Sequence, residues 1–180
     1  MELPARGTVE VRCFTNLPEA ELFLNGHSLG TRQLDDTNGY LSWQVEFESG
    51  TLDVRAAAED GTAVADCIET VGAAAQIALE PWRSPASADD RIVQVEVMIN
   101  DIAGQMVAGD RSKIEVSLEG PAELMGIESG DIADLTAYSS SYRHCYHGRA
   151  ILYIRKSKGA SESIRLTVRS ENLCSAMIEL

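Results

Sequence analysis

Apolar and polar residues alternate with a period of two in short runs along the whole chain. The clearest run is Ile92–Ile99, in which Val93, Val95, Val97 and Ile99 share one face. Such alternation predicts half-buried β-strands, because successive side chains of a strand point to opposite faces of its sheet. Helical periodicity is not sustained anywhere, so the pattern predicts an all-β chain.

The first half contains seven strand-like runs that follow one another at intervals of roughly 8–12 residues, as in β-sandwiches. Turn residues separate the runs, and Asn25-Gly26 is the strongest hairpin signal because a type I′ turn needs positive φ at both central residues. The predicted strands are Thr8–Thr15, Ala20–Leu24, Ser28–Leu34, Tyr40–Phe47, Thr51–Glu59, Thr62–Thr70 and Gln76–Glu80.

The second half repeats this organisation. Its predicted strands are Arg91–Asn100, Gln105–Val107, Lys113–Glu119, Ala122–Ile127, Arg149–Arg155, Glu162–Arg169 and Ser175–Leu180. Residues 128–148 form the longest stretch without a clear strand, and long loops in compact domains are commonly functional or packed over an open edge.

The chain is long enough for two domains of about 100 residues, each with its own core. Residues 82–91 interrupt the strand pattern with Pro, Ser and paired Asp, which is the composition of a linker. We therefore predict two tandem immunoglobulin-like antiparallel β-sandwiches, residues 1–80 and 81–180, with the boundary between Gln76 and Pro85.

The net charge of −13 limits the range of partners. Four basic and thirteen acidic residues in 1–75 give −9, and eleven basic and fifteen acidic residues in 76–180 give −4. Nucleic acid and anionic membrane surfaces are excluded as expected partners, because binding to either depends on clustered Lys and Arg. No apolar run approaches the roughly 20 residues that span a bilayer, so the segment is expected to be soluble.

Metal, cofactor and catalytic chemistry are not predicted. The four cysteines form no C-x-x-C pair, and His144-Cys145-x-His147 lacks the paired spacing of structural zinc sites. No Ser, His and acid arrangement, G-x-S-x-G turn or phosphate-binding glycine loop occurs. The acidic residues read as solvated strand and turn positions rather than as the paired carboxylates of a glycosidase.

Aromatic residues provide the candidate binding chemistry. Tyr138, Tyr142 and Tyr146, together with His144 and His147, form the densest aromatic and imidazole group of the chain, and stacking rings with polar tips suit sugars. The alternative is that the tyrosines anchor a loop to the sheet.

Two tryptophans complete the aromatic candidates. Trp82 either fills an inter-domain seam or stacks on a sugar, whereas Trp43 alternates with Leu41 and Val45 and is expected in a sandwich core.

Several segments resemble a known family. Asn16–Gly30, Leu41–Trp43, Gly50–Ala56, Ala65-Asp66 and Thr70–Gly72 are similar to the immunoglobulin-like domain that follows the catalytic barrel in bacterial β-galactosidases of glycoside hydrolase family 2. Val95–Val97, Glu119–Asp131, Gly148–Arg155 and Ser170–Ala176 resemble the next domain of those enzymes, and Arg143–Gly148 resembles the family's Arg, aromatic and Gly pattern.

The resemblance implies a noncatalytic accessory region whose parent enzyme acts on β-linked sugars with two glutamates of its barrel. It also implies structural roles for Arg143 and Tyr146. The expected partner is the catalytic domain of the parent, while polysaccharide or oligosaccharide binding and homo-oligomer formation stay open. Location in the bacterial cytoplasm or export with the parent is likewise open.

Overall fold

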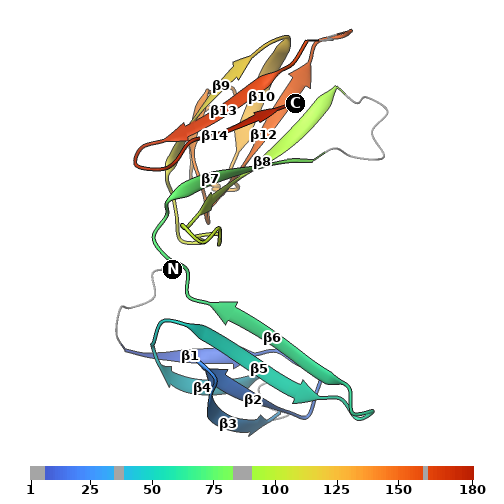
Figure 1. Cartoon of the computed structure of the whole chain (residues 1–180), viewed down its shortest axis with the longest axis vertical. Helices are drawn as coiled ribbons and strands as arrows, with labels where there is room; N and C mark the ends of the chain where they lie inside the picture. Colours follow the sequence, from blue (N-terminus) through green and yellow to red (C-terminus); the bar gives the residue numbers. More distant parts are fainter. Residues whose placement is uncertain (1–6, 35–38, 83–90, 160–161) are drawn as a thin grey trace. The chain divides into compact units, whose positions relative to one another are not determined.

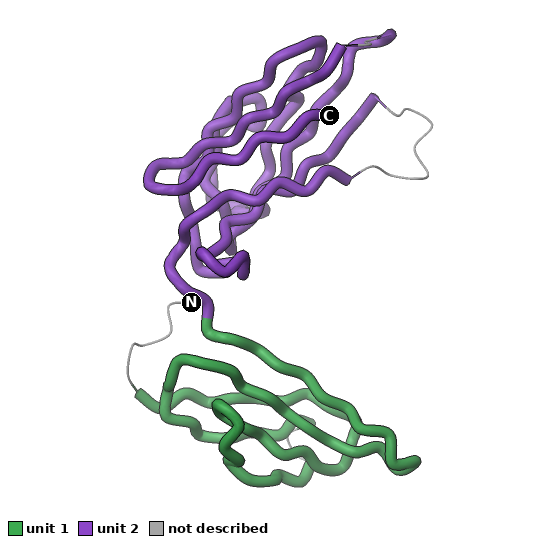
Figure 2. Tube along the Cα trace, in the orientation of Figure 1, with its two compact units in different colours: residues 1–70 green, residues 71–180 purple. Residues whose placement is uncertain are grey.

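The structure is a computed structural model that describes residues 7–34, 39–82, 91–159 and 162–180. These form two compact units, residues 1–70 and 71–180 (Figure 2). Every regular element among the described residues is a β-strand, and no described helix is long and apolar enough to cross a membrane. All named strand pairs are antiparallel, which confirms the predicted all-β class and its tandem sandwiches.

Unit 1 contains six strands in two sheets (Figure 1). One sheet has the order β1-β4 and the other the order β3-β2-β5-β6. The strands are β1 (Thr8–Cys13), β2 (Glu19–Leu24), β3 (His27–Gln33), β4 (Leu41–Glu46), β5 (Thr51–Ala57) and β6 (Ala63–Glu69).

The hairpin between β2 and β3 forms at the predicted Asn25-Gly26 turn. Both residues have positive φ, 51° and 80°, as a type I′ turn requires. The Asn25 side chain then accepts the Thr51 backbone N–H at 2.9 Å, so the turn is fastened to the start of β5. Gly50 has φ 143°, and a Cβ there would collide with this same Asn25 amide.

Trp43 lies in the core of unit 1, as predicted from its alternation with Leu41 and Val45. It is only 2% exposed, and its indole N–H donates to the Gly30 carbonyl at 2.9 Å. Because Trp43 belongs to β4 and Gly30 to β3, this bond joins the two sheets and places β4 opposite the β3 side of the larger sheet.

Unit 2 is an eight-stranded sandwich with sheet orders β10-β12-β8-β7 and β11-β9-β13-β14. The inward faces of both sheets supply one core, and the predicted face of Val93, Val95, Val97 and Ile99 is fully buried in it. The strands are β7 (Gln76–Trp82), β8 (Ile92–Asn100), β9 (Lys113–Glu119), β10 (Ala122–Glu128), β11 (Tyr142–His144), β12 (Arg149–Lys156), β13 (Arg165–Ser170) and β14 (Ala176–Glu179).

Strand β7 belongs to the second unit. All seven of its residues pair with β8, and Ile77 enters the unit 2 core. The run Gln76–Glu80 is predicted as the last strand of the first domain, 1–80, whereas the structure divides the chain after Thr70. An alternating run is compatible with an edge strand of either sandwich, so periodicity alone does not assign Gln76–Glu80 to one of the two units. Residues 83–90 of the predicted linker lie outside the described residues.

Because the two hydrophobic cores share no residue, a core defect in one unit should leave the other folded. Leu166→Ala, at a fully buried position of β13, is expected to cost unit 2 about 2–5 kcal/mol through lost burial and an unfilled cavity. Each unit carries one tryptophan, so urea unfolding of the Trp82→Phe background reports unit 1 through Trp43. An equal loss in the Trp43 transition would contradict independent cores.

Candidate functional site

The four aromatic residues predicted for sugar binding lie at separate places in unit 2. Trp82 is 53% exposed on β7, and Tyr142 is 43% exposed on β11 of the other sheet. Tyr138 is 63% exposed in the connection between β10 and β11, while Tyr146 follows β11 and is half-buried. The structure therefore does not bring all four side chains onto one surface.

Arg143 holds the connection between β10 and β11 against the sandwich. Its side chain is 2% exposed, and its guanidinium donates to the Asp134 carboxylate at 3.2 Å and to the Thr136 carbonyl. The same guanidinium lies 4.9 Å from the centre of the Tyr138 ring. Arg143 thus packs against the Tyr138 ring and holds it in place. This supports the structural role that the resemblance implies for Arg143.

Local donors lower the pKa of two carboxylates, one in this connection and one at the end of β10. Hydrogen bonds from Thr136, with the nearby charge of Arg143, lower the pKa of Asp134. The backbone N–H of Gly130, followed by a hydrogen bond with Tyr138, lowers the pKa of Glu128. The connection is therefore an ordered polar structure rather than a bare loop.

The side chains of His144, at the end of β11, and of Cys145, which follows it, differ in burial. His144 is exposed and Cys145 is 1% exposed, so their side chains point to opposite sides. Burial raises the pKa of Cys145 to about 12, which keeps the thiol protonated. Tyr146 lies edge-on to His147 and 5.0 Å from the Arg111 guanidinium, in an anchoring position.

Tyr142 lies in a shallow polar hollow on the outer face of the β11-β9-β13 sheet, here called the Tyr142 patch. Strand register places Tyr142, Glu115 and Arg169 in one row across the three strands. The hollow has a volume of about 290 Å³, and Ser117, Ser141 and Thr167 also line it. The Lys113 ammonium lies 4.5 Å from the Tyr142 ring. A ring, hydroxyls, a carboxylate and a guanidinium are the groups that a sugar can contact.

The outer face of the β10-β12-β8-β7 sheet carries an aromatic row that was not predicted from the sequence. Trp82, Gln94 and Tyr153 lie directly opposite one another on β7, β8 and β12. Tyr153 also borders a mostly apolar hollow of about 460 Å³ that includes Ile92, Met125 and Tyr138. Tyr153 was hidden in the apolar run Ile151–Ile154, and only the register shows that it shares a face with Trp82.

Asp101 organises the end of β8 although it is only 4% exposed. One carboxylate oxygen accepts the Gly72 N–H at 2.8 Å, and the other accepts the N–H groups of Ala103 and Gln105, each at 2.9 Å. These backbone hydrogen bonds, with that of Gly72 largest, lower the pKa of Asp101. Its role in the geometry is structural, because every donor belongs to the surrounding backbone.

No group of three or more His, Cys, Asp or Glu suited to a metal ion occurs within the described parts of the chain. The Tyr142 patch and the aromatic row are the surfaces of unit 2 that gather candidate binding groups.

Comparison with known proteins gives consistent matches over both units. The family described as glycoside hydrolase family 2 C-terminal domain 5 matches residues 77–179, and a domain of unknown function (DUF4982) matches residues 6–65. Beta-galactosidase BoGH2A of Bacteroides ovatus is 30% identical over 177 residues, which cover 96% of this chain and 20% of the relative.

Solved structures of glycosidases match at the level of the fold. A glycosyl hydrolase family 2 member from Bacteroides cellulosilyticus DSM 14838 has a TM-score of 0.84 at 25% identity, with coverage of 97% of this chain and 24% of that one. A second family 2 member from Bacteroides cellulosilyticus has a TM-score of 0.86 at 24% identity, covering 96% and 22%. A beta-glycosidase from Bacteroides vulgatus has a TM-score of 0.81 at 23% identity, with the same coverage.

The fold and these matches define a tandem β-sandwich segment of the glycoside hydrolase class. The chain belongs to glycoside hydrolase family 2 through its C-terminal domain 5, whose model matches more than half of the residues. It spans about a fifth of the length of the curated relative that it matches. This confirms the resemblance drawn from the sequence.

The hydrogen bonds of the Asp101 carboxylate should make the stability of unit 2 decrease at acidic pH. The pKa of Asp101 lies below the unfolded value of about 3.9, so its ionised form stabilises the fold at neutral pH, and this contribution is lost as the pH falls below about 4. Asp101→Asn is expected to lower the urea concentration at the unfolding midpoint at pH 7. The side-chain NH₂ group of Asn replaces one acceptor oxygen and then faces a backbone N–H donor. The difference from the parent chain should shrink at pH 3, and an undiminished difference there would contradict the assignment.

Proposed function

We propose that this chain is a noncatalytic accessory region of a β-galactosidase-type glycoside hydrolase and that it packs against the catalytic part of that enzyme. The observation that carries the proposal is the match over 96% of this chain to a β-galactosidase about five times longer. The likeness runs through both units, so the pair is inherited as one segment.

The surface chemistry supports a packing role. Large apolar side chains remain exposed on both units, including Phe14 and Ile68 on unit 1 and Trp82, Ile132 and Leu135 on unit 2. Apolar side chains that gather at a surface favour an interface. Rigid sandwiches can shape or shield a cleft that another part of the enzyme forms, because their loops are fixed by strand pairing. Support of an oligomer is a variant of the same positional role.

The packing role predicts association between separately produced parts. The remainder of the parent polypeptide, mixed with this chain, should form a 1:1 complex in sedimentation velocity, with a dissociation constant on the order of 1 µM, as for an interface between domains of moderate size. The complex should also turn over a nitrophenyl β-galactoside with a higher kcat/KM than the remainder alone. Absence of any complex at 50-fold excess over that constant would contradict the proposal.

A second candidate function is carbohydrate binding at the Tyr142 patch. It is favoured by the row of Tyr142, Glu115 and Arg169 beside hydroxyl side chains. Trp82, Tyr138 and Tyr146 are weaker candidates because they lie apart from this row.

Affinity electrophoresis tests this candidate. Soluble β-linked polysaccharides should retard the chain, and Tyr142→Ala should abolish at least nine-tenths of the retardation because the stacking ring is lost. Tyr138→Ala is the matched control, since it removes an exposed tyrosine ring of the same unit outside the patch. Equal retardation of both variants, or none for the parent chain, would remove the Tyr142 patch as a sugar site.

A further inference from the structure

Unit 1 has an uncovered face because its two sheets differ in width. The β1-β4 sheet has two strands and faces a sheet of four. Trp43 ties β4 to the β3 side, so β6 at the other end has no strand opposite it among the described residues. All seven residues of β6 are exposed, including Val64 at 48% and Ile68 at 63%.

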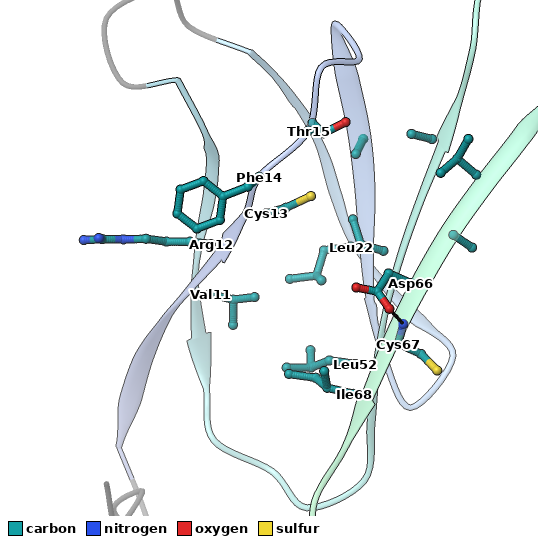
Figure 3. A pocket seen from close by; sticks show the side chains of 15 residues that line it. Val11, Arg12, Cys13, Phe14, Thr15, Leu22, Leu52, Asp66, Cys67 and Ile68 are labelled. Atoms are coloured by element: carbon teal, nitrogen blue, oxygen red, sulfur yellow. Dashed lines mark hydrogen bonds between the residues drawn. The ribbon is translucent and has the colours of Figure 1, made fainter. Parts of the chain in front are cut away.

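The exposed residues of β6 include its inward face. Val64, Asp66 and Ile68 lie directly opposite Ala56, Val54 and Leu52 of β5, which pack against the core of unit 1. In an antiparallel pair, residues directly opposite share a face, so these three side chains are on the inner side of the sandwich. Figure 3 shows Asp66 directed into this space and Cys67 directed away from it.

A groove runs between β1 and β6. It consists of two adjoining hollows of about 350 and 300 Å³ that share Val11, Arg12, Leu52 and Ile68. Figure 3 shows the larger of these two hollows. Along β1 and the two residues that follow it, the lining extends from Val9 to Thr15, which corresponds to roughly 20 Å of extended chain. This is the length of a strand of about six residues, and the groove walls are mainly apolar.

The edge of β1 that faces away from β4 pairs with no strand in the part of the chain that the structure describes. Phe47 N–H donates to the Gly7 carbonyl at 2.8 Å, so Gly7 directs its backbone groups toward the β4 side. Backbone direction alternates along a strand, and Thr8, Glu10 and Arg12 therefore direct their N–H and C=O groups to the opposite edge. An edge of this kind is a template for another strand.

The charge of the groove selects the strand that would fit. The Asp66 carboxylate accepts only the neighbouring Cys67 N–H, at 2.9 Å, and pairs with no cation in the part of the chain that the structure describes. Burial raises the pKa of the Cys13 thiol, and the charge of Asp66 raises it further. Residues 7–34 and 39–70 contain ten acidic and three basic residues. An occupant with a basic side chain at the position facing Asp66 is favoured.

We propose that the groove of unit 1 receives an extended segment of the longer parent polypeptide, which joins β1 as the third strand of the β1-β4 sheet and places a Lys or Arg against Asp66. The assignment rests on the proposed function, because the occupant comes from the part of the enzyme outside this chain. Its alternate residues are apolar and cover Val64 and Ile68. Addition of a strand to an open edge is a recognised mode of segment binding.

A second copy of this chain fits the groove less well. If β1 paired with β1 of a second copy, the two β1-β4 sheets would join into one layer of four strands. The β3-β2-β5-β6 sheets of both copies would then face this layer from the same side. Eight strands do not fit opposite four, so β5 and β6 of the second copy would collide with β6 of the first. The uneven sheets therefore favour a single added strand over a symmetric dimer.

Hydrogen exchange of the native complex tests the added strand. The backbone amides of Glu10 and Arg12 should exchange at least tenfold more slowly in the 1:1 complex with the remainder of the polypeptide than in this chain alone, because they gain acceptors. Val11, whose amide lies on the β4 side, is the internal control and should change little. Unchanged exchange at Glu10 and Arg12 in a complex that does form would overturn the groove assignment and leave the packing role standing.

Charge reversal on the groove floor provides an independent test. Asp66→Lys should weaken the complex at least tenfold, since the exposed site tolerates the change but then repels a basic side chain. Asp53→Lys makes the same charge change on the opposite face of the neighbouring strand and should leave affinity within twofold. Trp43 fluorescence checks the fold of both variants. Equal affinities would overturn the proposal, as would a sedimentation result showing that this chain alone dimerises through β1.

Discussion

The pairing of β7 with β8 completes one sheet of unit 2 and assigns β7 to that unit. Seven consecutive residues of β7 complete a four-stranded sheet in unit 2, and Ile77 fills part of its core. Among the described residues, unit 1 has β1 and β4 opposite a sheet of four strands. Unit 2 is thus a sandwich of two four-stranded sheets, whereas the two sheets of unit 1 differ in width.

The two units offer different kinds of surface. Unit 2 is closed, and its candidate binding groups stand on outer sheet faces, where the pairing of strands spaces them in rows. Unit 1 is open, and its candidate surface is the interior of the sandwich itself, with Asp66 among apolar side chains. An outer row suits a small polar ligand, whereas an open interior demands backbone hydrogen bonds and buried apolar area from a larger partner.

Much of the fold could be predicted from the sequence because alternation and turn chemistry are local. The Asn25-Gly26 turn and the core positions of Trp43 and Val93–Ile99 needed only the period of two and the φ preferences of two residues. The assignment of β7 could not be obtained in this way, since edge pairing depends on contacts between distant segments. The short strand β11 was missed for a related reason: its three residues are ordered by β9 rather than by their own pattern.

The candidate sites also depend on contacts between distant segments, which a local sequence pattern does not reveal. A cluster of aromatic residues in the sequence occupies separate positions in space, because Tyr142 pairs across to β9 and lies beside Lys113, whereas Tyr138 lies in the connection before β11 beside Arg143. Conversely, Trp82 and Tyr153 are far apart in the sequence and share one face only through the register of three strands. The inward position of Asp66 is likewise a property of register, since by composition it reads as an ordinary surface acid.

The four thiols differ in exposure, which allows the two units to be labelled separately. Cys67 is exposed on unit 1 and Cys174 is exposed on unit 2, while Cys145 is buried with a pKa of about 12 and Cys13 is partly covered. Maleimide dyes react with accessible thiolates, so the native chain offers one favoured attachment point on each sandwich. Donor and acceptor fluorophores at these two positions would follow the separation of the units by energy transfer, without any cysteine being introduced.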